Sequence, residues 1–269
     1  MNNLLLSFSG GETSAFMTKY CLDNISHKYD NVKVVFANTG QEHEKTLEFI
    51  NACDKNFGFE VIWVEAVINK QHRKGTKHKV VSYETADRYG GVYAKMIEKY
   101  GIPNKAYPHC TRELKLQPIT SYLRSIGWEK NSYDTAIGIR ADEIHRISSK
   151  VDVERIIYPL IEYFPMTKEK INSWWGKQGF RLDIPGYLGN CTWCWKKSEK
   201  KLGLVYKHDN SIFNFPKRME YEHGKYEDGN PRFFFRGNKS TEDMIKLIKS
   251  ELELSNDHNG CSDSCEVFN

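Results

Sequence analysis

A glycine-rich turn near the N-terminus carries the residue types that bind phosphate. The stretch Ser7–Ser14, with the sequence SFSGGETS, ends an apolar run and begins a segment with helical spacing. Two adjacent glycines let a backbone turn tightly around an anion, and hydroxyls and the N–H groups of a helix start donate hydrogen bonds to it. Neither the Walker A pattern nor GxGxxG is present, and an ordinary strand-to-helix connection would also explain a bare Gly-Gly pair. The residues predicted to bind a nucleotide here are Ser7, Ser9, Gly10, Gly11, Glu12, Thr13 and Ser14.

Basic side chains later in the chain are candidates for the same anion. Gly138 and Arg140 end another strand-like segment, and Arg146 follows shortly after them. Between the two arginines lie Asp142 and Glu143. A guanidinium group suits phosphate or sulfate, whereas carboxylates suit a hard cation such as Mg²⁺; ordinary surface arginines are the alternative. We predict that Gly138 and Arg140 bind the cofactor and that Arg140, Arg146 and, as a weaker candidate, Lys115 are catalytic.

Cysteines form the third group of candidates, and there are seven of them. In a reducing compartment, clustered cysteines indicate metal or redox chemistry rather than disulfides. Cys191 and Cys194 make a CxxC pattern, which alone allows zinc, a redox pair or an iron–sulfur cluster. A complete metal site needs further ligands, for which Cys110 and the tail cysteines Cys261 and Cys265 are candidates. Cys265 is also predicted as a mobile catalytic thiol.

Alternating strands and helices must position these groups. Apolar runs predict buried strands at Asn3–Phe8, Val32–Ala37, Glu60–Val67 and Tyr133–Ile139, with a short fifth strand at Ile156–Ile161. Helical spacing predicts helices at 13–26, 42–57, 93–100, 114–126, 168–178 and 241–252. This alternation indicates an α/β fold: an open, mostly parallel, twisted sheet with helices on both faces. Because ligands of such sheets bind at the carboxyl ends of the strands, the Ser7–Ser14 turn, Asn38, Thr39, Gly40 and Arg140 are expected around one crevice.

Length and charge set the remaining expectations. The chain of 269 residues suits a nucleotide-binding α/β domain at 1–180 and an irregular helical, CxxC-containing region with a tail at 181–269. A net charge of +4 permits an anionic partner without requiring one. The basic segment Lys70–Lys79 is expected to be an irregular solvated loop, with a nucleic-acid-facing surface as the alternative. No apolar run is long enough to span a bilayer, so a cytoplasmic protein without a membrane partner is expected.

Four ordered segments resemble one family. Ser9–Ser14 resembles the pyrophosphate loop of N-type ATP pyrophosphatases and, more closely, that of the phosphoadenylyl-sulfate (PAPS) reductase family. Ala37–Gly40 lies where that family reads adenine, Cys110–Pro118 resembles its Cys-x-x-x-x-Lys-x-x-Pro segment, and Gly138–Arg146 resembles its later Gly-x-Arg segment. The resemblance covers roughly residues 3–200. It implies an adenine nucleotide-binding enzyme that uses ATP, adenylyl sulfate or PAPS together with Mg²⁺.

The same resemblance implies a metal centre. Iron–sulfur members of the family hold a [4Fe–4S] cluster with a Cys-Cys pair and a CxxC farther along the chain, and His109 stands here in place of one cysteine of the pair. The predicted ligands are Cys110, Cys191, Cys194 and His109, for a [4Fe–4S] cluster or, alternatively, Zn²⁺. The tail lacks the reductases' Glu-Cys-Gly-Leu-His motif.

Three functions stay open from the sequence. The first is ATP-dependent adenylyl transfer coupled to sulfur transfer onto an acceptor, which the tail favours. The second is a sulfonucleotide reductase that produces sulfite, and the third is a non-catalytic nucleotide- or metal-dependent binding module. Related sulfurtransferases suggest tRNA or DNA as an acceptor and a sulfur donor protein as a partner, and a homodimer is compatible with the sequence.

Overall fold

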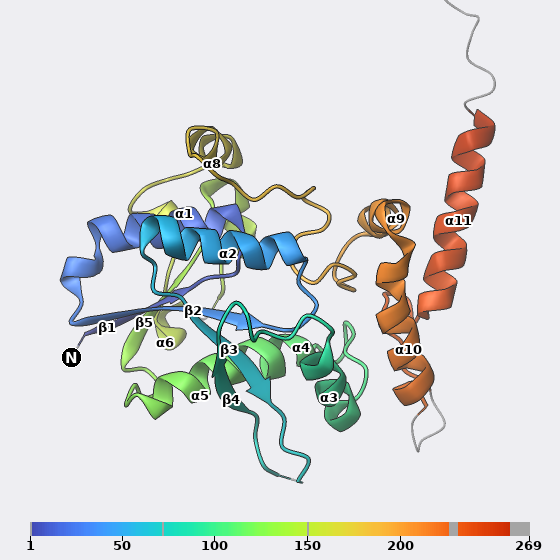
Figure 1. The fold of residues 1–269 in the computed structure, drawn as a ribbon, viewed down its shortest axis with the longest axis horizontal. Coiled ribbons are helices and arrows are strands. Elements are labelled where there is room, and N and C mark those ends of the chain that lie inside the picture. Colours follow the sequence, from blue (N-terminus) through green and yellow to red (C-terminus); the bar gives the residue numbers. More distant parts are fainter. Residues whose placement is uncertain (1, 72, 150, 226–230, 259–269) are drawn as a thin grey trace, which may run out of the picture. The chain divides into compact units, whose positions relative to one another are not determined.

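The computed structural model describes residues 2–71, 73–149, 151–225 and 231–258, drawn as coloured ribbon in Figure 1. The chain divides into two compact units. Unit 1 comprises residues 1–99 and 109–192, and unit 2 comprises residues 100–108 and 193–269. The domain boundary expected from the sequence at residue 180 stays a prediction.

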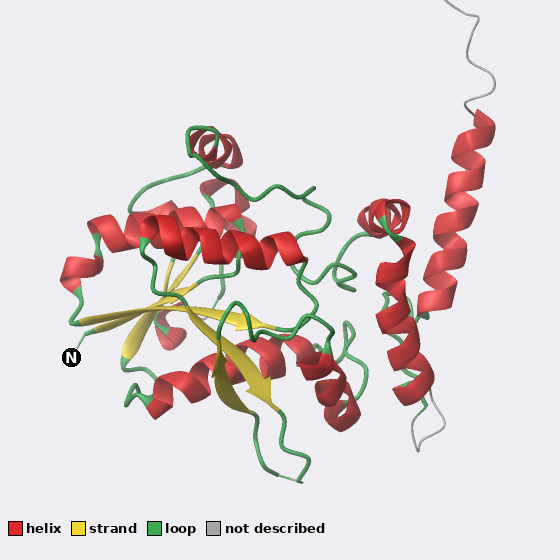
Figure 2. Ribbon diagram, viewed as in Figure 1, coloured by secondary structure: helices red, strands yellow, loops and turns green. Residues whose placement is uncertain are grey.

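Unit 1 is built on one six-stranded sheet (Figure 2). The strand order is β4-β3-β2-β1-β5-β6, and every neighbouring pair is parallel except β3 and β4. Ser7, at the end of β1, is level with Val35 of β2 and Ile137 of β5, so these three strands end at the same edge of the sheet. The strands are β1 (Asn3–Ser7), β2 (Asn31–Asn38), β3 (Ile62–Val67), β4 (Lys77–Val81), β5 (Tyr133–Ile137) and β6 (Ile156–Ile157).

Helices cover both faces of this sheet, with α1 and α2 on one face and α5 on the other (Figure 1). Successive side chains of a strand point to opposite faces. Leu4 and Leu6 accordingly lie in the larger core with residues of α1, α2 and α8, whereas Leu5 lies in a second core with Leu123 of α5. The α/β architecture expected from the sequence is therefore confirmed. The helices are α1 (Glu12–Asn24), α2 (Glu44–Phe57), α3 (Gly91–Tyr100), α4 (His109–Thr111), α5 (Gln117–Ser125), α6 (Val151–Glu154), α7 (Pro159–Glu162) and α8 (Lys168–Trp175).

Two sequence expectations about strands are wrong. The end of the basic segment, Lys77–Lys79, belongs to β4 and pairs antiparallel with β3, so only the earlier part of that segment lacks regular structure. The fifth strand expected at Ile156–Ile161 is limited to the two residues of β6. It stops because Pro159 begins α7, where its missing N–H costs nothing in the first helical turn.

Unit 2 is mainly helical. Its helices are α9 (Glu199–His208), α10 (Asn214–His223) and α11 (Thr241–His258), and α11 packs against both of the others. A short 3₁₀ turn, Asn210–Phe213, joins α9 to α10. Buried aromatic side chains fill much of the interior of unit 2. They are Trp193, Trp195, Phe213, Phe234 and Phe235. Within the described part of the chain, no helix combines the length and apolar character needed to cross a membrane.

Candidate functional site

The turn after β1 is shaped by its own hydroxyl groups. The Ser14 hydroxyl donates to the carbonyl oxygen of Gly11 at 2.9 Å. It also accepts hydrogen bonds from the Ser9 hydroxyl at 2.9 Å and from the Ser9 N–H at 3.2 Å. These three bonds fold the segment into a closed loop directly before α1. Gly11 caps that helix in an extended conformation, and no side chain of the described residues accepts a hydrogen bond at this cap.

Gly10 is required by both conformation and space. Its φ is +79°, a left-handed value that side chains with a Cβ rarely adopt. A Cβ built there would lie 2.8 Å from Ile50 Cδ1 and 2.9 Å from Thr46 Cγ2, both on α2. Gly138 is constrained by space alone, because its Cβ would lie 3.0 Å from the Cα of Ser14. The two glycines therefore let the end of β5 and helix α2 approach the loop.

Arg140 brings a positive charge to this loop. Its Nη1 donates to Thr13 Oγ1 at 3.3 Å, and its side chain is only 16% exposed. Asp142 holds the guanidinium through Nε at 2.9 Å and Nη2 at 3.2 Å. These bonds keep the pKa of the Asp142 carboxyl below its ordinary value. The arginine is therefore fixed next to the first turn of α1, beside the turn that the sequence predicts to bind phosphate.

A second arginine is linked to the first through a shared carboxylate. Glu143 lies 3.2 Å from Arg140 Nη1 and 2.5 Å from Arg146 Nη1. Arg146 is 55% exposed and lies in the 3₁₀ turn Ala141–Arg146. The structure thus brings Arg140 to the loop, while a catalytic role of Arg146 stays a prediction.

Glu12 has a partner far away in the sequence. Its two carboxylate oxygens accept hydrogen bonds from Arg181 Nε at 3.0 Å and Nη2 at 3.1 Å. Its carbonyl oxygen accepts a hydrogen bond from Trp175 Nε1 at 3.0 Å. The start of α1 is therefore tied to the segment after α8. Asp142 and Glu143, the carboxylates that the sequence suggests for Mg²⁺, are ion-paired with arginines, as Glu12 is, and do not fit a protein-held Mg²⁺ site in this arrangement.

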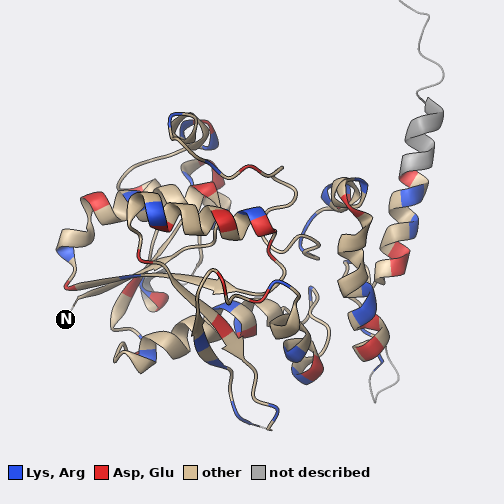
Figure 3. Ribbon diagram, in the orientation of Figure 1, with Lys and Arg blue, Asp and Glu red and all other residues tan. Residues whose placement is uncertain are grey.

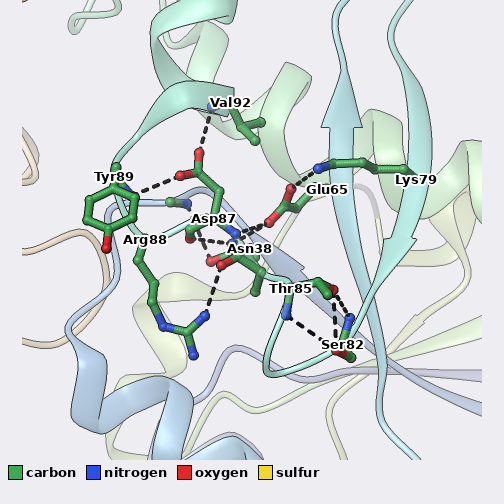
Figure 4. A network of polar contacts seen from close by, with 11 residues as sticks. Asn38, Glu65, Lys79, Ser82, Thr85, Asp87, Arg88, Tyr89 and Val92 are labelled. Carbon is green, nitrogen blue, oxygen red and sulfur yellow. Dashed lines mark hydrogen bonds and ion pairs between the residues drawn. The ribbon is translucent and has the colours of Figure 1, made fainter.

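The end of β2 is held by a buried network (Figure 4). The Asn38 amide donates to Glu65 Oε1 at 2.7 Å and to the carbonyl oxygen of Asp87 at 2.8 Å. Glu65 Oε1 also accepts the Asp87 N–H at 2.6 Å, and Lys79 Nζ lies 2.8 Å from the other oxygen. Asn38 and Glu65 are both fully buried. The Glu65 carboxylate therefore joins its own strand, β3, to strands β2 and β4 and to the turn after β4.

The Asp87 side chain fixes the turn that packs on Gly40. Its carboxylate accepts hydrogen bonds from the N–H groups of Tyr89 and Val92, both at 2.8 Å. Gly40 has a φ of +77°, and a Cβ there would lie 2.7 Å from Asp87 Oδ2. The segment predicted to read adenine is thus held in a defined conformation by groups that the sequence analysis did not identify. A signal for Glu65 existed, since it is a carboxylate inside the otherwise apolar stretch 61–67.

Cys191 is anchored next to the same strand end. Its Sγ lies 3.4 Å from Thr39 Oγ1, and that hydroxyl and the Thr39 N–H both donate to the Glu42 carboxylate. The Thr192 N–H donates to the carbonyl oxygen of Gln41 at 3.0 Å. The first cysteine of the CxxC pattern is therefore placed beside the predicted nucleotide segment.

The Cys110–Pro118 segment contains an irregular helix. His109 and Cys110 form α4, and a π-helical stretch, Arg112–Leu116, follows before α5. Short π-helical stretches within α-helices occur frequently at functional sites. Lys115 lies in this stretch and is half-buried. The buried Glu113 carboxylate accepts hydrogen bonds from Thr76 Oγ1 and from Arg112 Nε, the latter at 2.6 Å.

The predicted metal ligands are divided between the two units. In residues 2–258, apart from the gaps given above, no group of three or more His, Cys, Asp or Glu side chains is arranged to hold a metal ion. Cys110 and Cys191 belong to unit 1 and Cys194 to unit 2. The catalytic cysteine predicted at Cys265, like Cys261, lies outside the described residues. The metal centre and the thiol stay predictions.

Comparison with known proteins gives a family model that covers most of unit 1. A model of the phosphoadenosine phosphosulfate reductase domain matches residues 3–168. The chain is 30% identical, over 98% of its own length and 94% of the relative's, to the uncharacterized nin region protein ORF290 of Escherichia phage lambda. It is 24% identical to the uncharacterized protein MJ0066 of Methanocaldococcus jannaschii over 58% of this chain, which is 26% of that protein. A second protein of that organism, MJ0973, is 26% identical over 44% of this chain and 22% of its own length.

Proposed function

The chain belongs to the phosphoadenosine phosphosulfate reductase domain family, and from this premise we propose that it transfers the adenylyl group of ATP to an acceptor before sulfur transfer to that acceptor. The observation that carries the proposal is the contact of Arg140 with Thr13 at the start of α1. A guanidinium, a closed glycine turn and a helix N-terminus without a side-chain cap together suit a polyphosphate.

The nucleotide would lie along the edge where the parallel strands end. The β- and γ-phosphates would accept hydrogen bonds from the first N–H groups of α1 and from Thr13. Asn38–Gly40, at the end of β2, would present its backbone to the adenine. The hydrogen bonds of Asn38 with Glu65 and Asp87 support adenine binding by this segment. They hold the loop in one conformation, and an ordered loop loses little conformational entropy when it binds a ligand.

Arg140 would stabilise the negative charge that develops at the α-phosphate during the reaction. An acceptor oxygen attacks the α-phosphorus, the bond from that phosphorus to the bridging oxygen breaks, and pyrophosphate leaves with the bonding electrons. The acceptor proton passes to solvent. A fixed guanidinium stabilises the negative charge on the oxygens around the five-coordinate phosphorus of the transition state. A sulfur nucleophile then displaces AMP, so that the acceptor exchanges an oxygen for a sulfur.

Bound metals receive no step in this mechanism. The carboxylates suggested for Mg²⁺ are held by arginines, and the cysteines suggested for a cluster are not grouped in the described structure. The iron–sulfur prediction has its own test, which is anaerobic purification followed by an absorption spectrum and iron analysis. A brown, iron-containing protein that loses its colour in Cys110→Ala would support the prediction. A colourless, iron-free protein would reject it.

Release of pyrophosphate from labelled ATP tests the proposed reaction. Candidate acceptors are tRNA, DNA and small hydroxyl compounds, each with and without a sulfide source or a sulfur donor protein. We expect acceptor-dependent pyrophosphate release that Arg140→Gln reduces and that Arg155→Gln does not. Arg155 is the matched control because it pairs with Asp134, at the other end of β5.

Two results would replace the proposal. Sulfite formed from adenylyl sulfate, without pyrophosphate from ATP, would identify a sulfonucleotide reductase. A protein that binds nucleotide but is inert to both substrates would be a binding module.

A further inference from the structure

Unit 2 contains a cavity of about 370 Å³ that the proposed reaction does not use. Its apolar wall is formed by Trp195, Leu202, Phe235 and Met244, all of them buried. Its polar wall is formed by the segment that leads into α9 and by Arg236. All of these residues belong to unit 2, so the cavity shares no residue with the Ser7–Ser14 loop.

The polar wall of the cavity is strongly basic. Lys197, Lys200 and Arg236 line it, and basic residues gather on the segment that enters α9 and on that helix (Figure 3). The Arg236 guanidinium is oriented by a hydrogen bond from Nη2 to the carbonyl oxygen of Lys196 at 3.0 Å. The single carboxylate in the lining, Glu199, is paired with Lys239 at 2.7 Å. The lining therefore has a net positive charge.

Helix α9 adds backbone donors to this wall. It has ten residues and begins at Glu199, with Ser198 as its cap. The Ser198 hydroxyl accepts a hydrogen bond from the Lys201 N–H at 3.4 Å. The first N–H groups of a helix have no partner within the helix, and they carry the positive end of its dipole. Ser198, Glu199 and Lys200 all line the cavity, so these donors lie beside it.

Trp195 places an aromatic ring in the wall of the cavity. The residue lines the cavity and is 5% exposed, and its indole Nε1 is buried without a hydrogen-bond acceptor among the described residues. The Lys196 ammonium lies 5.3 Å from the centre of the same ring. The residue therefore borders both the cavity and a basic side chain, so its NMR signal reports on an anion bound in the cavity.

We propose that this cavity binds a phosphate group, with Lys200, Arg236 and the N-terminus of α9 as its ligands. The apolar wall would contact the rest of the phosphate-bearing molecule. The phosphate belongs either to a small molecule or to the backbone of a nucleic-acid strand, and the two sources share the same chemistry at the cavity.

The indole signal of Trp195 in a ¹H–¹⁵N correlation spectrum of the full chain tests the site directly. The chain has six tryptophans, and Trp195→Phe assigns the signal. Titration with inorganic phosphate should shift it saturably, with a dissociation constant on the order of millimolar. A thymidine octamer without terminal phosphates separates the two sources. A stronger response to the octamer identifies a strand, and a response to inorganic phosphate alone identifies a small molecule.

Matched variants decide whether the cavity is responsible. Lys200→Gln combined with Arg236→Gln should weaken the response by about tenfold or more, whereas Lys207→Gln, in the last turn of the same helix, should not. Arg140→Gln should leave the response unchanged, so a failure of the proposed adenylyl transfer does not affect this test. Lys200→Arg should retain binding. A Trp195 signal that stays fixed with both probes, or that shifts equally in the double variant, would overturn the proposal.

Discussion

The turns at Gly10 and Gly40 have nearly the same glycine φ but different surroundings. Both follow neighbouring parallel strands, and their φ values are +79° and +77°. A Cβ at Gly10 would meet apolar atoms of α2, whereas one at Gly40 would meet the carboxylate of Asp87. Glycine is therefore required at both positions, but for contacts of different chemistry.

The two turns differ in how far their polar groups are already paired within the protein. Around Gly40, the polar groups bind one another, because Asn38, Glu65 and Asp87 form a buried network. Around Gly10, the helix start lacks a side-chain cap among the described residues, and Arg140 is positioned next to it. The φ values of the two glycines do not distinguish the two turns, whereas the pairing of the surrounding polar groups does.

Substitution of Gly10 should have the largest effect. Gly10→Ala combines a left-handed φ with contacts below 3 Å to Ile50 and Thr46. It should lower the free energy of unfolding by about 2–4 kcal/mol and abolish ATP binding. Urea denaturation and ATP titration measure the two effects.

Gly11→Ala is the matched control for this prediction. The Gly11 φ is −100°, and the nearest atom to its Cβ, Ser9 Oγ, lies 3.9 Å away. Its unfolding free energy should change by less than about 0.5 kcal/mol. Equal destabilisation in both variants would show that the loop does not depend on the conformation of Gly10.

Removal of the Asp87 carboxylate should have the next largest effect. Asp87→Ala leaves the N–H groups of Tyr89 and Val92 without their acceptor and should cost about 2 kcal/mol of stability. Asp183→Ala is the control, because Asp183 forms an exposed ion pair with Lys45 and should change stability by less than about 1 kcal/mol.

A double-mutant cycle tests the contact between Asp87 and Gly40. Gly40→Ala should destabilise Asp87→Ala less than it destabilises the parent protein, because the carboxylate that would meet the new Cβ is gone. Strict additivity of the two substitutions would contradict the contact and weaken the comparison of the two turns.

Substitution of Arg140 should affect binding more than stability. Arg140→Gln removes the cation at the loop and should weaken ATP binding by about tenfold, which corresponds to about 1.4 kcal/mol. The change in unfolding free energy should stay below about 1 kcal/mol, since the pairs of Arg140 are partly exposed. Isothermal titration of Arg140→Gln and Arg155→Gln measures the effect. Equal affinities in the two variants would remove Arg140 from the site.

The smallest effect should be a dependence on pH. Arg140 lowers the pKa of Asp142 from its ordinary value of 3.8, so the ionised carboxylate is favoured in the folded protein. Its contribution to stability is present above that value and is lost as the pH falls through the lower folded pKa. The stability difference between the parent and Asp142→Asn should therefore be constant from pH 7 to 5 and vanish at lower pH. A difference that persists in acid would have another cause.

The sequence predicts the parallel part of the fold well because that part has strong local signals. Apolar runs at Leu4–Leu6, Val34–Ala37 and Trp63–Val64 are buried on both faces of a sheet, and helical spacing marks the crossovers. Strand β4 was not predicted, since its sequence KHKVV resembles a solvated basic segment and its pairing with β3 is a tertiary contact.

The candidate site is predictable only in part. The glycines and Arg140 follow strand ends and can be found from local patterns. The partners of Glu12 and Asn38 cannot, because Arg181 is 169 residues from Glu12 and the carbonyl oxygen of Asp87 is 49 residues from Asn38. Such contacts depend on how the loops return to the sheet, which no local spacing encodes.

The sequence of strand β4 also affects the tendency of this protein to aggregate. It is a terminal strand of the sheet, so one side of its backbone has no neighbouring strand within the described chain. An open edge can pair with a strand of another molecule and start aggregation, and lysines on an edge strand oppose this association. Lys77 and Lys79 lie on β4 next to the exposed Val80. The basic character of this stretch thus protects the sheet edge, whether or not nucleic acid ever touches it.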